Sequence, residues 1–224
     1  MTLEVIIKKL KAQANPKNVI GMARFGIKSD QALGVSIPFL RALAKNIGHD
    51  HSLALSLWQI KIHEAKILAA LIDDYELVTE KQMESWVKGF DSWDVCDQVC
   101  SNLFDRTPFA WIKAIAWSSR QEEYVKRAGF VLMAVLAVHD KKTGDKSFLK
   151  FFPYLKKESI DSRNFVKKSI NWALRQIGKR SLYLNGKVTK LCLEIQEIDS
   201  SSAKWIATDA LRELKEKAQK LAKK

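Results

Sequence analysis

An indole and a carboxylate lie one helical turn apart in the segment FDSWDVCDQVC. If residues 92–104 form a helix, four side chains share one stripe with Cys96 beside it: Trp93, Asp97, Cys100 and Phe104. Asp97 would then be a charged group on a mostly apolar face, where loss of hydration is costly unless the carboxylate is paired or used. Two interpretations stay open. Asp97 either caps or forms a salt bridge with a neighbouring helix, or it serves a function.

The segment 162–179 places a tryptophan among cations. At 100° per residue, five apolar side chains form its core stripe: Val166, Ile170, Ala173, Leu174 and Ile177. The opposite side holds two aromatic and three basic side chains: Phe165, Lys168, Trp172, Arg175 and Lys179. Trp172 either packs under a neighbouring repeat or forms an aromatic platform flanked by cations, a common composition for nucleic-acid contact.

One arginine stands out in the segment 121–138. The core stripe there has five members: Val125, Gly129, Leu132, Met133 and Leu136. Tyr124, Arg127 and Val131 point the other way, and the basic Lys126 lies beside Arg127. Arg127 is either a surface or salt-bridge residue, or a planar fork on a concave repeat face that clamps a phosphate.

The elements that must position these residues are helices. Apolar residues at helical spacing predict thirteen of them, and no strand pattern of comparable strength occurs. The predicted helices are 2–13, 16–25, 37–47, 50–58, 62–73, 79–88, 92–104, 107–118, 121–138, 146–157, 162–179, 184–195 and 200–221. The sequence therefore predicts an all-α chain.

Local signals mark several helix ends. N-caps are predicted at three residues that precede prolines: Asn15, Ser36 and Thr107. Thr79 with Gln82 predicts a capping box. The pair Asn185-Gly186 could be a hairpin turn, but the helical period after it favours a connection between two helices.

Some of these helices resemble one another. Each combines a basic residue with small and apolar positions: HEAKILAALI (63–72), YVKRAGFVLM (124–133), FVKKSINWAL (165–174) and SAKWIATDAL (202–211). Their basic residues are Lys66, Arg127, Lys168 and Lys204, and the later spacings, 41 and 36 residues, suit a two-helix repeat of the HEAT type. The pattern predicts one domain, residues 1–224, of HEAT-like helical repeats stacked into a curved solenoid whose concave face carries the basic residues.

The charge is strong and uneven. The 224 residues carry 38 Lys and Arg against 25 Asp and Glu, a net charge of +13. Residues 140–180 hold 12 basic and 4 acidic side chains, a net charge of +8, whereas residues 51–123 hold 7 and 12. This polarity indicates nucleic acid as the partner. The alternative is a lysine-rich solvated surface with no partner.

The sequence does not suit a secreted or a membrane-spanning protein. Three cysteines suit a reducing cytosol, and the longest apolar run, 129–138, is too short to span a bilayer. The N-terminus has no signal-peptide cleavage pattern. Cys96 and Cys100 have no His or further Cys nearby in sequence, so a zinc site is not expected, and no phosphate loop, HExxH or nucleophile elbow indicates a cofactor. We expect a cytoplasmic, nucleoid-associated monomer without a metal or cofactor.

Together these residues resemble the DNA alkylation repair family, the AlkD-like HEAT-repeat DNA glycosylases. The resemblance runs from NPKNVIGMARFGI through DSWDVCDQVC and VKRAGF to FVKKSINWALRQIGKR, and its specific part is the combination of WDVCD (93–97) with KSINWALR (168–175). It implies that Trp93, Asp97, Arg127 and Trp172 converge on the concave face as the catalytic set. It further implies DNA contacts by six residues: Lys126, Lys167, Lys168, Arg175, Phe165 and Lys204. Two positions depart from the pattern, because Phe25 replaces a Tyr and its hydroxyl, and Asn164 replaces a Phe.

The resemblance implies removal of cationic N3- and N7-alkylated purines, such as 3-methyladenine and 7-methylguanine, from duplex DNA. Such a base leaves without a general acid, so the need is to stabilise a sugar with oxocarbenium character. Asp97 can stabilise that cation and orient water, and the two indoles can contact a cationic nucleotide. Arg127 would hold a phosphate. The expected enzyme is monofunctional, leaves an abasic site and needs no deep base-flipping pocket.

Two alternatives belong to other classes. A non-catalytic HEAT-like module would bind DNA or bridge a repair protein without releasing a base. A protein scaffold would show no salt-dependent DNA affinity at all. The isolated carboxylate Asp97 favours the enzyme, since a pure binder has no need of it. We also expect most other acidic residues of 51–123 to face the convex side, away from DNA.

Overall fold

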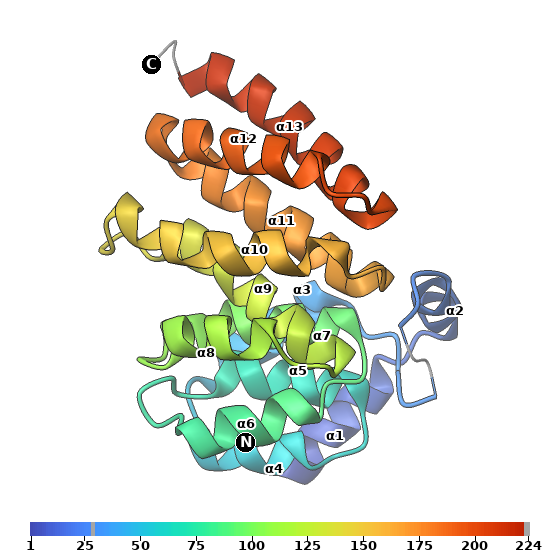
Figure 1. Cartoon of the computed structure of the whole chain (residues 1–224). Coiled ribbons are helices and arrows are strands. Elements are labelled where there is room, and N and C mark those ends of the chain that lie inside the picture. Colours follow the sequence, from blue (N-terminus) through green and yellow to red (C-terminus); the bar gives the residue numbers. More distant parts are fainter. Residues whose placement is uncertain (28–29, 222–224) are drawn as a thin grey trace. The chain divides into compact units, whose positions relative to one another are not determined.

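The computed structural model describes residues 1–27 and 30–221, and these residues form helices joined by turns, with no strand among them (Figure 1). The chain divides after Thr107 into two compact units, and each is described by itself. The all-α prediction is confirmed. The prediction that residues 1–224 form a single domain stays a prediction.

Unit 1, residues 1–107, contains the first seven α-helices and one 3₁₀ turn: α1 (Leu3–Ala12), α2 (Pro16–Arg24), α3 (Ile37–Ile47), α4 (His51–Trp58), α5 (His63–Ile72), α6 (Glu80–Lys88), α7 (Trp93–Asn102) and η1 (Phe104–Arg106). Its core includes the rings of Trp58 and Trp86, which stack with centroids 4.1 Å apart. Phe90 and Phe104 complete this aromatic cluster. Phe104 of this cluster lies in η1, which packs against α7, the helix that carries Trp93.

Unit 2 begins at Pro108 and contains the remaining elements: α8 (Ala110–Ser118), α9 (Glu123–His139), η2 (Asp145–Phe151), α10 (Phe152–Lys157), η3 (Glu158–Ile160), α11 (Asn164–Arg180), α12 (Leu182–Gln196) and α13 (Ser201–Leu221). Consecutive helices pack on one another, with α9 between α8 and α11, and with α11, α12 and α13 stacked together (Figure 1). This layering places α9 at the centre of the unit.

The burial of α9 follows from that central position. Every residue from 125 to 137 is buried, although the sequence pattern had predicted a core stripe on one side only. Val131 is fully buried and Arg127 is 5% exposed. A helix with packed neighbours on both sides has no free face, so the predicted outward side of 121–138 is an interior side.

Most predicted helix ends are confirmed by their caps. The side chain of Asn15 accepts hydrogen bonds from the backbone N–H groups of Lys17 and Asn18, and the hydroxyl of Ser36 accepts one from the N–H of Phe39. Caps of this kind satisfy donors that the first helical turn leaves without a partner. The local signals therefore fixed where α2 and α3 begin.

The capping box at Thr79 is half formed. The N–H of Gln82 donates to the Thr79 hydroxyl at 3.1 Å, as predicted. The side-chain nitrogen of Gln82 donates to a carboxylate oxygen of the buried Asp73 at 2.6 Å. The Gln82 side chain thus also binds a group that lies outside α6.

Two predicted helix starts are wrong. Thr107 does not cap α8, since its hydroxyl donates back to the Phe104 carbonyl at 2.8 Å and α8 begins at Ala110. The first half of the predicted helix 146–157 is the 3₁₀ segment η2, and α10 begins only at Phe152. Pro153 lacks an N–H and cannot donate to the carbonyl four residues earlier, so an α-helix running through it would lose a bond.

The pair Asn185-Gly186 is neither a hairpin turn nor a connection between helices. Both residues lie inside α12. Asn185 is buried and its amide donates to the Leu214 carbonyl of α13 at 3.1 Å. The turn propensity of the pair is overridden because the asparagine has a partner in the next helix.

Candidate nucleic-acid interface

Trp93 and Asp97 lie one turn apart on α7 and both are partly exposed. The indole Nε1 of Trp93 donates to the Phe25 carbonyl at 3.0 Å, which fixes the orientation of the ring. The hydroxyl of Ser101 donates to the backbone carbonyl of Asp97 at 2.6 Å. The indole and carboxylate are thus presented together on the accessible side of a helix whose opposite side is core.

The rest of the predicted stripe belongs to that core. Cys100 and Phe104 are fully buried, and Phe104 lies beyond the end of α7 in η1. Burial is the main reason why the pKa of the Cys100 thiol is raised well above its ordinary value, and neighbouring Cys96 raises it further. Cys100 is therefore a packing group and not a nucleophile, and Cys96 is likewise buried.

Beneath Trp93 lies an ion pair that the sequence did not reveal. His63 of α5 places its Nε2 2.7 Å from a carboxylate oxygen of Asp94. Burial opposes the charge on both groups, but their mutual hydrogen bond and attraction outweigh it, raising the pKa of His63 and lowering the pKa of Asp94. The two residues are 31 positions apart, so no spacing pattern could have found the pair.

Arg127 is held inside unit 2. It is 5% exposed, and its Nη1 donates to the backbone carbonyl of Phe165 in α11 at 2.6 Å. The Phe165 ring in turn lies 5.9 Å from that of Tyr124. Arg127 therefore links α9 to α11, the helix that carries Trp172. The sequence alone had left open whether this arginine is a surface or salt-bridge residue or clamps a phosphate.

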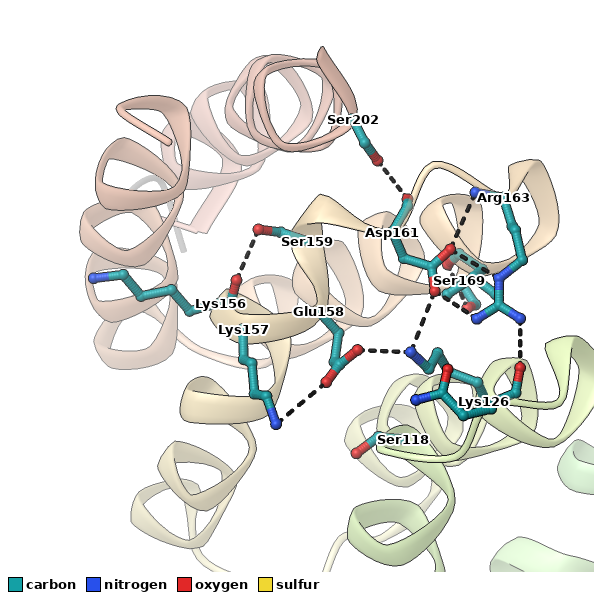
Figure 2. Close-up of polar contacts among 12 residues, drawn as sticks. Ser118, Lys126, Lys156, Lys157, Glu158, Ser159, Asp161, Arg163, Ser169 and Ser202 are labelled. Carbon is teal, nitrogen blue, oxygen red and sulfur yellow. Dashed lines mark hydrogen bonds and ion pairs between the residues drawn. The ribbon is translucent and has the colours of Figure 1, made fainter. Parts of the chain in front are cut away.

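Lys126, expected from the sequence to contact DNA, is buried in an ion-pair cluster. It is 5% exposed, and its Nζ lies 2.7 Å from a Glu158 oxygen and 3.2 Å from an Asp161 oxygen (Figure 2). Arg163 also binds Asp161 and donates to the Gln121 carbonyl. Hydrogen bonds from Arg163 and Lys126 lower the pKa of Asp161, although burial opposes this. The positive charge of Lys126 is therefore balanced by carboxylates within unit 2.

The predicted core stripe of α11 is confirmed, since all five of its members are buried. On the other side Trp172 is partly exposed and Lys168, one turn before it, is exposed. Arg175 and Lys179 both form ion pairs with Glu213 of α13. The two cations lower the pKa of that carboxylate even though burial would raise it. Two of the three predicted basic residues of this face thus share one carboxylate, and Lys168 does not take part in that pair.

The remaining basic residues differ in whether they are exposed or engaged with other groups of the chain. Lys167 places its Nζ 5.1 Å from the ring centroid of Trp205. Lys204 is exposed, and its Nζ lies 3.3 Å from a carboxylate oxygen of Asp199. In unit 1, Lys66 donates to the Gly89 carbonyl and pairs with Asp91 at 2.9 Å. Of the four recurring basic residues, Lys168 and Lys204 are exposed and the other two are engaged inside their units.

Two acidic residues of the 51–123 segment serve the interior of unit 1. Glu64 is 1% exposed and accepts hydrogen bonds from the backbone N–H groups of Leu33, Gly34 and Val35 at 2.7–3.2 Å. Asp73 is also buried. These carboxylates face neither solvent nor DNA, and the outward orientation of the others stays a prediction.

The structure assembles the predicted catalytic set in two pairs. Trp93 and Asp97 share α7 in unit 1, whereas Arg127 and Trp172 lie on the packed helices α9 and α11 of unit 2. The convergence of the two pairs stays a prediction. Among the residues described, no three His, Cys, Asp or Glu side chains gather as a metal-binding group, and no helix is long and apolar enough to cross a membrane.

Comparisons with family models and with solved structures both find similar proteins. The family model described as "DNA alkylation repair enzyme" matches residues 6–214. A solved structure described as "a new family of proteins related to the HEAT-like repeat DNA glycosylases with affinity for branched DNA structures" is similar, with a TM-score of 0.79 at 17% identity over 95% of each chain. No curated protein matches by sequence. The prediction of a HEAT-like helical fold is confirmed.

Proposed function

This chain belongs to the DNA alkylation repair enzyme family, and on that premise we propose that it is a DNA glycosylase acting on cationic N3- and N7-alkylated purines in duplex DNA. The observation that carries the proposal is the pairing of Trp93 with Asp97. Both side chains are accessible one turn apart on α7, while the helix is otherwise anchored in the core. An accessible indole beside a carboxylate suits a cationic nucleotide.

The carboxylate would act on the sugar. An alkylated purine cation departs as a neutral base, taking the electrons of the glycosidic bond and leaving oxocarbenium character on the deoxyribose. Asp97 stabilises this charge and orients a water molecule, which adds to the anomeric carbon and loses a proton. The product is an abasic site and the free base. No general acid is required for the leaving group.

The other three residues would position the DNA. The indole faces of Trp93 in unit 1 and of Trp172 in unit 2 can each attract a positively charged group, and each such contact contributes about 0.5–2 kcal/mol. Arg127 is buried and donates to the Phe165 carbonyl, so it would act indirectly, by fixing α9 against α11, the helix that carries Trp172. The exposed Lys168 and Lys204 add affinity that falls with salt.

A second candidate function is DNA binding without cleavage. The structurally similar protein is described as having affinity for branched DNA. In this chain several cations that could track a long duplex are paired internally, namely Lys126, Arg175 and Lys179. These three cations are therefore less available to contact an extended DNA backbone.

A base-release assay on methylated duplex DNA distinguishes the two functions. The parent protein should release 7-methylguanine or 3-methyladenine, and Asp97→Asn should reduce the single-turnover rate by about 100-fold or more while leaving duplex affinity nearly unchanged. Glu194→Gln is the matched control, because that exposed carboxylate pairs with Lys156 at the surface of unit 2. Release by Asp97→Asn at the parental rate would contradict the mechanism, and binding without any release would establish the second function.

A further inference from the structure

Helix α2 is an amphipathic helix without a core. None of its nine residues is buried, and the side chains of Ile20 and of the adjacent Phe25 are 60% and 71% exposed. A helix this short is marginal by itself and normally depends on a packed apolar face. Here the apolar face of α2 lies open.

Polar contacts at the ends of α2 hold it to unit 1 instead. Before the helix, the backbone N–H of Asn15 donates to the Leu33 carbonyl at 2.7 Å. Within it, the amide of Asn18 donates to the Gly34 carbonyl at 2.9 Å. After it, the Phe25 carbonyl accepts the indole N–H of Trp93. These hydrogen bonds, together with the close approach of Asn18 and Val19 to Gly34, hold α2 to unit 1.

The space beneath α2 is a pocket of about 500 Å³, which lies within the usual range for small-molecule sites. It is bounded by α2, the segment 34–37, α5 and α7. Its apolar walls are formed by Met22, Phe25, Ile27, Ile37, Ile67 and Trp93. The pocket thus combines two aromatic rings with branched aliphatic side chains, an environment suited to a flat apolar group.

Polar groups occur at two places in this pocket. The His63–Asp94 pair and the hydroxyl-bearing Ser36 supply donors and acceptors within the lining. At the rim, the lining residue Lys17 is exposed, and Arg24 is exposed at the other end of the same helix. Residues able to hydrogen-bond the edge of a flat ring therefore occur together with cations able to bind an attached phosphate.

We propose that this pocket receives a nucleobase that is unstacked from DNA, with its ring between Phe25 and Trp93, its edge near the His63–Asp94 pair, and the flanking phosphates at Lys17 and Arg24. The inference rests on the proposed function for the presence of DNA and goes beyond it, since the base received is an already unpaired one and not the alkylated base, for which no such pocket is expected. Trp93 borders both this pocket and the accessible side of α7 that carries Asp97. Unpaired bases at bulges and branch points provide such a ring without the energy needed to open a base pair.

Gly21 provides a direct test. It lies inside α2 and lines the pocket, and a Cβ added to it would meet no atom within 4 Å. Gly21→Leu therefore adds an apolar side chain to the pocket lining with no clash at its Cβ, and it favours the helix. Gly186→Leu is the matched control, because a Cβ at Gly186 is equally unhindered and that residue lies in α12 of unit 2.

The probes are two DNA duplexes of the same length, one with a single unpaired 2-aminopurine and one with 2-aminopurine paired to thymine. The parent and Gly186→Leu should bind the bulged duplex at least about tenfold more tightly, the effect of stacking one base, with quenching of the 2-aminopurine emission. Gly21→Leu should bind the two duplexes equally and retain the parental affinity and salt dependence for the paired duplex. Phe25→Ala, a second variant that removes an exposed ring, should reduce the preference.

The outcomes separate the two proposals. Equal binding of both duplexes by the parent, or an unchanged preference in Gly21→Leu, would overturn the pocket proposal even if methylated bases are released. A preference that Gly21→Leu abolishes, in a parent that releases no base, would support the pocket and contradict the glycosylase. Absence of any DNA binding would contradict both. Circular dichroism melting confirms that each variant is folded.

Discussion

Gly129 is the position where a single methyl group should disturb the centre of unit 2. It lies in α9 against α8, and an added Cβ would be 2.8 Å from the Cα of Ser118 and 2.9 Å from the carbonyl oxygen of Ala114. Both of these atoms are backbone, so no side-chain rotation relieves the overlap. Gly129→Ala can be accommodated only if α8 moves away from α9.

Two opposing effects set the magnitude. Replacing glycine by alanine inside a helix stabilises it by about 1 kcal/mol. Overpacking against groups that cannot rotate away destabilises by roughly 1–3 kcal/mol, and rigid backbone places this site in the upper part of that range. Gly129→Ala should therefore lower the free energy of unfolding by about 1–2 kcal/mol. Gly186→Ala, which meets no atom within 4 Å, should raise it by about 1 kcal/mol.

Urea unfolding followed by far-ultraviolet circular dichroism measures both variants. Gly129 and Gly186 lie in the same unit, so the same transition reports both substitutions. Because the substitution and the secondary structure are identical, helix propensity cancels in the comparison and the expected difference of about 2–3 kcal/mol isolates the α8–α9 contact. If Gly129→Ala were as stable as Gly186→Ala, the close approach of the two helices and the central position of α9 would be refuted.

Three further substitutions test contacts between distant parts of the sequence. His63→Gln should lower Tm most at pH values between 3.8 and 6.5, the ordinary pKa values of Asp94 and His63. The difference in Tm from the parent should shrink as the pH rises through the raised pKa of His63. A difference in Tm that does not depend on pH would contradict the ion pair. Glu64→Gln should lower the free energy of unfolding by about 1–3 kcal/mol, because a buried acceptor of three backbone N–H groups becomes neutral, and faster hydrogen exchange at those amides would locate the effect. Lys126→Met should destabilise unit 2 by roughly 1–3 kcal/mol, since the partly buried Glu158 loses its nearer cation and keeps only Lys157 at 3.8 Å. The slope of DNA affinity against salt should stay as in the parent, and a smaller slope would restore Lys126 as a phosphate contact.

The helices could be predicted because their signals are local. Apolar residues at helical spacing and caps such as Asn15 and Ser36 depend on neighbours a few positions away, and the structure reproduces them. Errors occurred where a distant group or a proline intervened. Asn185 found its partner in α13, and Pro153 interrupted the regular hydrogen bonding before α10.

The candidate site could be predicted only in part, for the same reason. Trp93 and Asp97 share a face because four residues make about one helical turn, whatever the rest of the chain does. Helical spacing could not predict which lysine and arginine side chains are exposed. Lys126 and Lys168 are similar in sequence context, yet one is buried in an ion pair and the other is exposed.

The sequence by itself determined the all-helical fold, the positions of most helices and the residue types available for chemistry on DNA. Only the tertiary structure decided which charges are consumed inside the fold and where space remains. The ion pairs of Lys126 and Arg175 and the pocket beneath α2 each join segments from different helices. Helix periodicity acts within a few residues, whereas the burial of a charge or the opening of a pocket depends on which helices pack together.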